Sequence, residues 1–385
     1  MSFKGLALSL AALQSQHLHR QVTSVEGGNG ILLRRQGRDY VNFSSNDYLG
    51  LARDPLVKTA AINAINDYGI GSGGSSLVTG YSVLHQRLED LICEITGCER
   101  AMLFSSGFAA NSGVISALLS DGDLLLQDKL NHASLMEAGM QSPATMQRFV
   151  HNDMTRLHTL LDKSNHDNKL VVSEGVFSMD GDQGDLAKLS SLAKEHDSWL
   201  MVDDAHGFGI NGDGRGTCAE AKITPDILMA TFGKAIGTCG AFVAASSDVI
   251  DYLTNTCRHY IYSTALPMPV VAATIKSIEL AQQTGRREKL AARIDYFRQQ
   301  CQRYGLALMP SHSAIQPIII GKSDKAIAMS DHLKSQGIWV SAIRPPTVPP
   351  NTARLRITLS ANHEFSHIDA LVKALIEARE VANDQ

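Results

Sequence analysis

Two polar residues, Asp203 and Lys234, follow apolar segments and are of the types that chemistry on a nitrogen heterocycle requires. Asp203 comes directly after the apolar run 199–202. A carboxylate there could bind a metal ion, form a structural ion pair or hold a proton on a ring nitrogen. Lys234 lies in a glycine-containing turn beside Phe232 and Ile236. Apolar surroundings favour the uncharged amine, a nucleophile for carbonyl groups, although a lone lysine in a loop could equally be solvated.

A third element is the segment 104–111, Phe-Ser-Ser-Gly-Phe-Ala-Ala-Asn, where an expected strand turns sharply into an expected helix. The first N–H groups of a helix lack partners within the helix, and together with the helix dipole they bind anions. The segment could also be an ordinary serine cap. A lysine, a carboxylate and an anion-binding turn at Gly107 are the three groups that pyridoxal 5'-phosphate (PLP) requires, so the combination predicts PLP as cofactor.

The segment 69–74, Gly-Ile-Gly-Ser-Gly-Gly, matches the G-x-G-x-x-G pattern of dinucleotide-binding proteins, with Glu89 and Asp90 about 20 residues later. In those proteins the pattern follows a strand and opens a helix. Here residues 55–68 have the period of a helix, and the next helix is expected only from Ser82. We therefore predict a flexible connection, or a loop that approaches a ligand closely, and no nicotinamide or flavin site.

No metal site is expected from the sequence. The six cysteines include no C-x-x-C pair, and no cysteine and histidine residues have the spacing of zinc ligands. Thinly spread cysteines of this kind are typical of reduced, mostly buried thiols in a cytoplasmic protein. They are Cys93, Cys98, Cys218, Cys239, Cys257 and Cys301.

The charge balance and the apolar runs exclude two classes of partner. Lys and Arg number 35 and Asp and Glu 39, so no global positive field favours nucleic acid or anionic lipid. No apolar stretch reaches the roughly 18 residues of a membrane span. The apolar run 5–13 after Lys4 is like a short signal peptide. However, Leu6, Leu10 and Leu13 repeat at helical spacing and no cleavage pattern follows, so we expect an amphipathic helix.

The elements that must position these residues alternate between strand and helix, which predicts an α/β fold. Such alternation implies crossover connections in a mostly parallel sheet that helices cover on both faces. Ligands of these sheets bind beyond the carboxyl ends of the strands, where Asp203 and Lys234 lie. The expected strands are 101–104, 124–126, 170–172, 199–202 and 227–230, and the expected helices include 82–94, 109–119 and 186–196.

The chain of 385 residues is longer than one domain of about 150 residues, so two or three domains are expected. A hairpin is expected at 31–43, and the sequence becomes helical beyond about residue 265 before a smaller α+β segment. We predict an N-terminal arm at 1–45, a large PLP-binding α/β domain at 46–280 and a smaller C-terminal α+β domain at 281–385.

With these motifs identified, the sequence resembles the α-oxoamine synthases, which are PLP-dependent enzymes of fold type I. The resemblance runs nearly end to end, with one departure: Ala235 follows the lysine where many relatives have glycine. Residues 80–82 and 344–349 resemble the biotin-biosynthesis branch most closely. The other segments that carry the resemblance are 42–50, 71–75, 131–134, 174–182, 203–207, 231–234 and 342–343.

The resemblance implies roles for five residues around the cofactor ring. Lys234 would bind PLP covalently, Asp203 would pair with the ring nitrogen, and His132 would stack on the ring face. Ser178 and His206 would contact the region of the phenolic oxygen. Without the other motifs, the segment around His132 could simply cap a helix.

The resemblance also implies a phosphate site that two subunits share. The N–H groups of Gly107 and Phe108 would hold the phosphate together with Thr231. Ser263 or Thr264 would reach it from the other subunit of a homodimer. The active sites would therefore lie at the subunit interface.

For the substrates, the resemblance implies that Arg344 and Asn46 bind the carboxylate of the amino acid. Thr347 would line the substrate pocket and Arg20 would meet the acyl donor. From the residues alone, Arg344 before two prolines could be a rigid surface turn, and Arg20 could complement a helix dipole.

The reaction implied for this branch is a decarboxylative condensation of L-alanine with a pimeloyl thioester, carried by CoA or by acyl carrier protein. Lys234, His132 and Asp203 would be the catalytic residues. Two alternatives stay open: another α-oxoamine synthase that uses glycine, such as glycine C-acetyltransferase, and a non-catalytic subunit with the same fold. The second would be expected to lack the lysine. The sequence does not distinguish the two thioester carriers.

Overall fold

The computed structural model describes residues 3–27 and 29–383, and it divides into two compact units. Unit 1 consists of residues 1–48, 179–181 and 288–385, and unit 2 of residues 49–178 and 182–287. The expected arm at 1–45 therefore groups with C-terminal residues in this division. The expected domain boundaries at 45/46 and 280/281 stay predictions.

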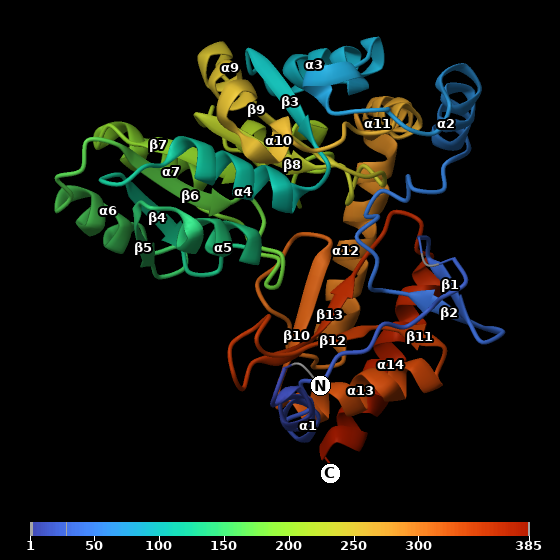
Figure 1. The fold of residues 1–385 in the computed structure, drawn as a ribbon. Helices are drawn as coiled ribbons and strands as arrows, with labels where there is room; N and C mark the ends of the chain where they lie inside the picture. Colours follow the sequence, from blue (N-terminus) through green and yellow to red (C-terminus); the bar gives the residue numbers. More distant parts are fainter. Residues whose placement is uncertain (1–2, 28, 384–385) are drawn as a thin grey trace. The chain divides into compact units, whose positions relative to one another are not determined.

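Unit 2 is built on a seven-stranded sheet, drawn from cyan to yellow in Figure 1. Five neighbouring strands are parallel, and one strand runs antiparallel to both of its neighbours, so the predicted mostly parallel α/β fold is confirmed. In sheet order the strands are β3 (Arg100–Phe104), β9 (Ala241–Ala245), β8 (Ile227–Thr231), β7 (Trp199–Asp203), β6 (Lys169–Glu174), β4 (Leu124–Asp128) and β5 (Thr145–Phe149).

The five strands that the sequence predicted are all present, and β5 and β9 are additional. β5 is an edge strand whose residues are mostly polar and exposed, so it lacks the apolar run of a buried strand. β9 is fully buried but rich in alanine, which has a low strand propensity. Both strands therefore depend on pairing with their neighbours.

Helices pack on the sheet of unit 2, with α4 and α5 in front of it in Figure 1. The core against the strands includes Val114, Ile115, Leu135 and Ile250. The predicted helices 82–94, 109–119 and 186–196 are confirmed as α3, α4 and α7. The helices are α2 (Pro55–Tyr68), α3 (Val83–Thr96), α4 (Gly107–Leu118), α5 (Ala133–Gln141), α6 (Met154–Asp162), α7 (Leu186–Glu195), α8 (Thr217–Glu220), α9 (Ser247–Thr256), α10 (Arg258–Ile261) and α11 (Met268–Ala281), with the short turns η1 (Ser76–Gly80) and η2 (Gly212–Gly214).

The glycine-rich segment 69–74 connects α2 to η1, so it follows a helix, as predicted. It lies against another part of the backbone: the N–H of Ala265 donates to the carbonyl of Gly74 at 3.0 Å. A Cβ on Gly80 would lie 2.1 Å from that same carbonyl oxygen. Small residues are therefore required here for the close approach of two chain segments.

Unit 1 contains two three-stranded sheets. The predicted hairpin is confirmed as β1 (Leu32–Arg35) and β2 (Arg38–Asn42), and Gln36 and Gly37 in its turn have φ of 50° and 73°. β11 (Ile338–Trp339) pairs in parallel with β2, which explains why the N-terminal residues group with C-terminal ones. In the second sheet, β13 (Ala353–Thr358) lies between β10 (Ile315–Gly321) and β12 (Ser341–Ile343).

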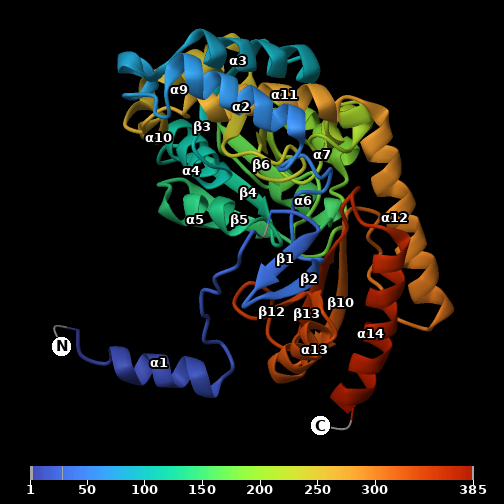
Figure 2. The same ribbon diagram turned by 90° about the vertical axis from the view of Figure 1, so that its right-hand side faces the viewer.

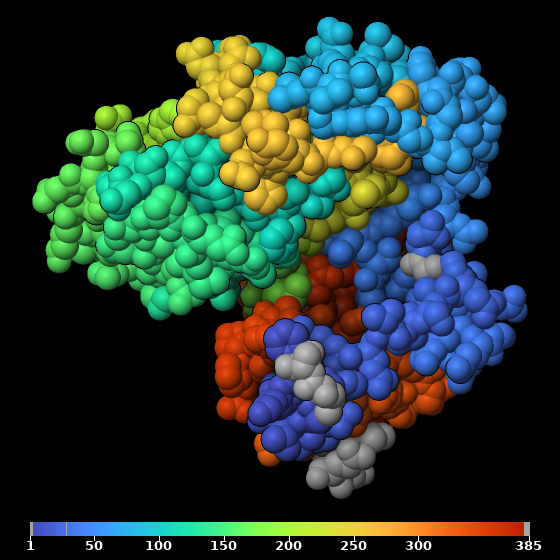
Figure 3. All heavy atoms as spheres, viewed as in Figure 1, coloured from blue at the N-terminus to red at the C-terminus, as the bar shows by residue number. Residues whose placement is uncertain are grey.

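The long helices of unit 1 are α12 (Thr284–Arg303), α13 (Ser323–Ser335) and α14 (Phe365–Asn383). α13 packs on α14 and on the strands of both sheets, as Figure 2 shows. The predicted N-terminal helix is confirmed as α1 (Leu6–Ser15), but none of its residues is buried, and it extends away from the rest of unit 1 in Figure 2. Its side chains lie at the surface in Figure 3.

Among the described residues, none of the helices combines the length and the apolar character needed to cross a membrane. The six cysteines are free thiols. Cys218, Cys257 and Cys301 are buried, Cys93 and Cys98 are half-buried, and Cys239 is exposed.

His151 joins three segments at the carboxyl edge of the sheet in unit 2. Its Nδ1 lies 3.1 Å from Oδ1 of Asp128, at the end of β4, and its Nε2 lies 2.6 Å from Oδ2 of Asp182, in the loop after β6. Burial lowers the pKa of His151, but the hydrogen bonds and charges of both carboxylates outweigh it and raise the pKa to about 10. A charged imidazole therefore connects the segments.

We expect this contact to stabilise the fold at neutral pH and to lose its effect in alkali. Because the folded-state pKa is raised from 6.5 to about 10, the stabilisation is complete below pH 6.5 and disappears as the pH rises to 10. Replacing His151 by glutamine, which does not titrate, should lower the Tm by roughly 2–4 °C at the acidic end of this range.

Differential scanning calorimetry of both proteins across this pH range measures the effect. Other titrating groups are common to both proteins, so the difference between their Tm values isolates His151. A difference that stays constant up to pH 10 would show that the imidazole is not held in its charged form.

Candidate active site

The carboxyl ends of β6 and β7 place two carboxylates side by side. Glu174 ends β6, Asp203 ends β7, and the two residues are partners in the parallel register. Both are buried, with 2% and 4% of their surface exposed. Because side chains of paired residues in a sheet point to the same face, the two carboxyl groups are neighbours.

The carboxylate of Asp203 is held in place by two hydrogen-bond donors. The side-chain amide of Asn111, on α4, donates to Oδ2 at 2.8 Å. The backbone N–H of Ala205 donates to Oδ1 at 3.0 Å. Hydrogen bonds from two N–H groups stabilise a carboxylate in a buried site, so Asp203 can keep a proton on a basic group opposite it.

Glu174 differs from Asp203 in its electrostatics. Burial raises the pKa of Glu174 well above its ordinary value, and the charge of Asp203 raises it further. Lys234 and a hydrogen bond from the N–H of His132 lower it only in part. The surroundings of Glu174 therefore disfavour its ionised form.

His132 is the N-cap of α5, and its ring is fixed by its own helix. Its Nδ1 lies 2.8 Å from the hydroxyl of Ser134 and accepts the N–H of Ser134 at 3.2 Å. Desolvation by the surrounding protein lowers the pKa of His132, the charge of Asp203 raises it, and Lys234 lowers it. The imidazole is therefore neutral at neutral pH, which suits stacking on an aromatic ring.

Lys234 lies in the loop between β8 and β9. Phe232 and Ile236 on either side of it are fully buried and anchor the loop, while Lys234 itself is half-buried. Its charge acts on both His132 and Glu174. The structure thus brings together Lys234, Asp203 and His132, which lie far apart in the sequence.

Two of the predicted phosphate-binding residues, Gly107 and Thr231, lie close together at this edge of the sheet. α4 begins at Gly107 after the cap Ser106, whose hydroxyl accepts the N–H of Ala109 at 3.1 Å. A Cβ on Gly107 would lie 3.9 Å from the Cβ of Thr231, at the end of β8. The first turn of α4 and the Thr231 side chain therefore border one space, where the helix N-terminus favours an anion.

The remaining cofactor-binding residues that the sequence predicted occupy three loops of unit 2. Ser178 follows β6 and His206 follows β7, and both are buried. Ser263 and Thr264 follow α10, and Thr264 forms an isolated bridge with Ser75 of the glycine-rich connection. Whether these four residues contact a cofactor stays a prediction.

The residues of unit 2 fit PLP. The chemistry of this ligand needs an amine for its aldehyde, a stabilised carboxylate for its ring nitrogen and N–H groups for its phosphate. Lys234 supplies the amine and Asp203 the carboxylate, while the start of α4 supplies N–H groups. Because Gly107 carries no side chain, an anion can approach the backbone there closely.

In unit 1, the arginine that contacts Asn46 is Arg356, whereas the sequence predicted Arg344. Nη1 of Arg356 donates to Oδ1 of Asn46 at 3.1 Å, and the hydroxyl of Tyr48 donates to the same oxygen at 3.1 Å. Arg344 instead donates to the backbone carbonyl of His17. β13 thus brings Arg356 beside residues 46–48. The predicted binding of the amino-acid carboxylate by Arg344 and Asn46 stays a prediction.

Arg20 and Thr347 are in direct contact, since Nη2 of Arg20 donates to the Thr347 hydroxyl at 3.0 Å. Burial and then the positive charge of Arg20 lower the pKa of Arg344. Arg20, Arg344 and Thr347 therefore form one polar cluster between the N-terminal segment and β12. Their roles toward substrates stay predictions.

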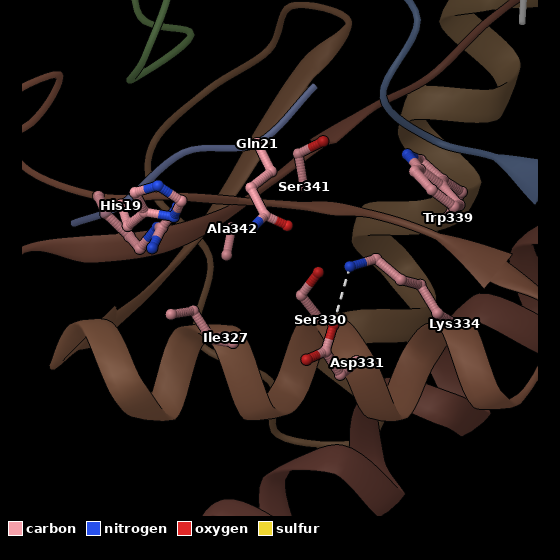
Figure 4. A pocket seen from close by; sticks show the side chains of 10 residues that line it. His19, Gln21, Ile327, Ser330, Asp331, Lys334, Trp339, Ser341 and Ala342 are labelled. Atoms are coloured by element: carbon pink, nitrogen blue, oxygen red, sulfur yellow. Dashed lines mark hydrogen bonds and ion pairs between the residues drawn. The ribbon is translucent and has the colours of Figure 1, made fainter. Parts of the chain in front are cut away.

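A pocket of about 510 Å³ adjoins this cluster in unit 1. Figure 4 shows that its walls come from the N-terminal segment, from α13 and from the strands β11 and β12, and that Lys334 pairs with Asp331 at 2.8 Å. The lining residues are His19, Gln21, Ile327, Ser330, Asp331, Lys334, Trp339, Ser341, Ala342 and Arg344.

Three residues of these sites were not predicted as functional: Glu174, Asn111 and Arg356. For two of them the sequence contains a signal. Arg356 is a charged residue among the apolar residues of β13, and Glu174 ends an apolar strand as Asp203 does. Asn111 gave no signal, because only the packing of α4 brings it to Asp203.

Comparison with known proteins identifies the family. The model of the family "Aminotransferase class I and II" matches residues 38–375. The chain is 49% identical to an 8-amino-7-oxononanoate synthase from Vibrio atlanticus, over 98% of this chain and 93% of the relative. It is 50% identical to an enzyme of the same name from Aeromonas salmonicida, over 96% and 94% of the two chains.

Two solved structures agree with this assignment. The 8-amino-7-oxononanoate synthase from Francisella tularensis matches with a TM-score of 0.77 at 30% identity, over 90% of this chain and 98% of the other. A serine palmitoyltransferase from S. paucimobilis with bound PLP and myriocin matches with a TM-score of 0.91 at 29% identity, over 100% and 99%. The chain therefore belongs to the aminotransferase class I and II family and, within it, to the 8-amino-7-oxononanoate synthases.

Proposed function

We propose that the protein catalyses the PLP-dependent condensation of L-alanine with a pimeloyl thioester to give 8-amino-7-oxononanoate, CO2 and the free thiol carrier, a step of biotin biosynthesis. The observation that carries the proposal is the convergence of Lys234, Asp203 and His132 at one sheet edge. The names of relatives about 50% identical over nearly the whole chain support the same reaction.

When bound, PLP supplies an aldehyde that condenses with amines and a protonated ring that accepts the electron pair left by bond cleavage at Cα. Asp203 keeps the proton on the ring nitrogen. Lys234 Nζ removes the Cα proton of alanine and later returns it. His132 would lie against one face of the ring and would polarise the thioester carbonyl that the alanine Cα attacks. The thiol carrier leaves, and the alanine carboxylate departs as CO2.

The remaining predicted residues bind rather than transfer protons. Ser178 and His206 contact the phenolic-oxygen region of the cofactor. The phosphate is held by Gly107, Phe108 and Thr231, together with Ser263 or Thr264 from the other subunit of a homodimer.

For the substrates, we assign the alanine carboxylate to Arg356 and Asn46, which are already hydrogen-bonded to each other. A guanidinium and an amide together offer a carboxylate several donors, and the charged one sets the strength of binding. Arg20, with Thr347 and Arg344 beside it, is assigned to the acyl donor. In this proposal Arg344 lies near the acyl donor, whereas the resemblance had implied that it binds the amino acid.

Two coarser features are also proposed. The exposed leucines of α1, among them Leu6 at 54% and Leu10 at 49%, have no cover within this chain, which supports a homodimer. The six free cysteines support a location in the cytoplasm.

The first test is the choice of amino acid. With a pimeloyl thioester as donor, we expect the purified protein to release thiol with L-alanine at a rate at least about tenfold above that with glycine, since one methyl group in a fitted pocket is worth 1–3 kcal/mol. Thiol release and mass spectrometry of the product measure this. Faster turnover with glycine and acetyl-CoA would indicate glycine C-acetyltransferase instead, and both thioester carriers should be compared.

The second test is removal of the lysine. Lys234→Ala should lower kcat by roughly 10³-fold or more, because the group that moves the Cα proton is lost. It should also release PLP during gel filtration, which absorbance measures. Lys188→Ala, at an exposed lysine on α7, is the matched control and should behave as wild type. Turnover by Lys234→Ala at the wild-type rate would disprove the mechanism.

The third test separates the two arginines. Arg356→Lys should raise the KM for L-alanine by about 10- to 100-fold, because a lysine cannot reproduce the charged hydrogen bonds of the guanidinium. The KM for the thioester should change little. Arg344→Lys should leave the KM for L-alanine nearly unchanged. Steady-state kinetics with each substrate varied measures both constants. The opposite pattern would return the alanine carboxylate to Arg344.

A further inference from the structure

Glu174 is a buried carboxyl group to which the proposed reaction assigns no role. It is 2% exposed, and its partner in the sheet register is another carboxylate, Asp203. Burying a carboxyl group beside a like charge costs free energy, so a residue chosen for stability alone would be apolar or an amide. Residues 170–172 of β6 are apolar, and Lys169 at its start is only half-buried, so Glu174 is the one fully buried ionisable side chain of its strand.

The contact that Glu174 makes is specific. Its Oε1 accepts the backbone N–H of His132, the N-cap of α5. The same residue is fixed from its other side, because the ring Nδ1 of His132 contacts Ser134. The Ser134 hydroxyl in turn accepts the amide of Asn111, which also donates to Asp203. A continuous chain of hydrogen bonds therefore leads from Glu174 through His132 to Asp203.

We infer that Glu174 is a positioning residue: by accepting the N–H of His132 it fixes the start of α5, and so sets the place of the imidazole relative to Asp203 and Lys234. The inference rests on the proposed function, in which His132 covers the ring of PLP. For this role Glu174 needs only an oxygen atom that accepts the N–H of His132. An amide can supply that acceptor and an apolar side chain cannot, so two variants separate the possibilities.

Glu174→Leu and Glu174→Gln are the informative variants. In Glu174→Leu the N–H of His132 loses its acceptor, and we expect kcat to fall by roughly 100-fold, as for a misplacement of about 1 Å. In Glu174→Gln the amide oxygen replaces Oε1, and we expect kcat within about threefold of wild type. The Tm of Glu174→Gln should equal or exceed that of wild type, since repulsion with Asp203 is removed.

A readout independent of turnover is the NMR signal of the His132 ring in protein labelled with ¹⁵N-histidine, with and without PLP. His132→Gln assigns the signal. We expect Glu174→Leu to shift it and Glu174→Gln to leave it close to its wild-type position. The shift should appear without PLP as well, because the hydrogen bond from His132 to Glu174 belongs to the chain itself.

The matched control is Asp123→Asn. Asp123 is also a buried carboxylate next to a strand of the same sheet, but it precedes β4 and so lies at the opposite edge. It accepts the N–H of Ser120 at 2.7 Å and the amide of Asn168 at 2.8 Å. We expect this variant to lose Tm while keeping its kinetic constants and its His132 signal, as a purely structural carboxylate would.

Two results would overturn the inference. If Glu174→Leu lowers the Tm but keeps the kinetic constants and the His132 signal, as expected for Asp123→Asn, Glu174 has only a structural role. If Glu174→Gln loses as much activity as Glu174→Leu at native Tm, the charge or proton of Glu174 matters and positioning does not. Should Glu174→Leu fail to fold, a tenfold loss in Glu174→Gln at native Tm still overturns it. Absence of wild-type turnover with alanine and pimeloyl thioester would refute the proposed function instead, and leave the NMR test intact.

Discussion

The parallel register of β6 and β7 is the constraint on which the active site depends. It pairs Glu174 with Asp203, so two carboxyl groups end neighbouring strands at one edge of the sheet. In a parallel sheet every strand ends at the same edge, so the loops and helices that follow the strands all begin at that edge. The starts of α4 and α5 and the loop of Lys234 therefore converge on the two carboxyl groups without any local sequence relation between them.

Each carboxyl group at this edge is accommodated by a different physical means. Asp128 at the end of β4 is paired with a charged imidazole, His151. Asp203 accepts hydrogen bonds from neutral N–H donors. Glu174 has a raised pKa and accepts a backbone N–H. The three carboxyl groups therefore have different electrostatic surroundings, and Asp203 is the one that we propose faces the ring nitrogen of PLP.

The sequence predicted most of the fold of unit 2 because buried parallel strands are continuous apolar runs. It missed β5 and β9, whose strand character comes from their neighbours rather than from their own residues. It also singled out Asp203 and Lys234, which we propose as catalytic residues, because each follows such a run. Contacts between distant segments were less accessible from the sequence: Arg356 was not predicted as a site residue, and only the register of β13 places it beside Asn46.

Arg354 and Arg356 show why composition could not reveal the anion sites. Both lie on β13 two positions apart, hence on the same face, and both are buried. Arg354 pairs with Asp180 at 2.6 Å, whereas Arg356 donates to Asn46. A buried guanidinium of this kind acts locally, on the groups beside it, where a basic surface would act at long range. A chain with a net charge of −4 can therefore bind a phosphate and two carboxylate-bearing substrates through single side chains and backbone N–H groups.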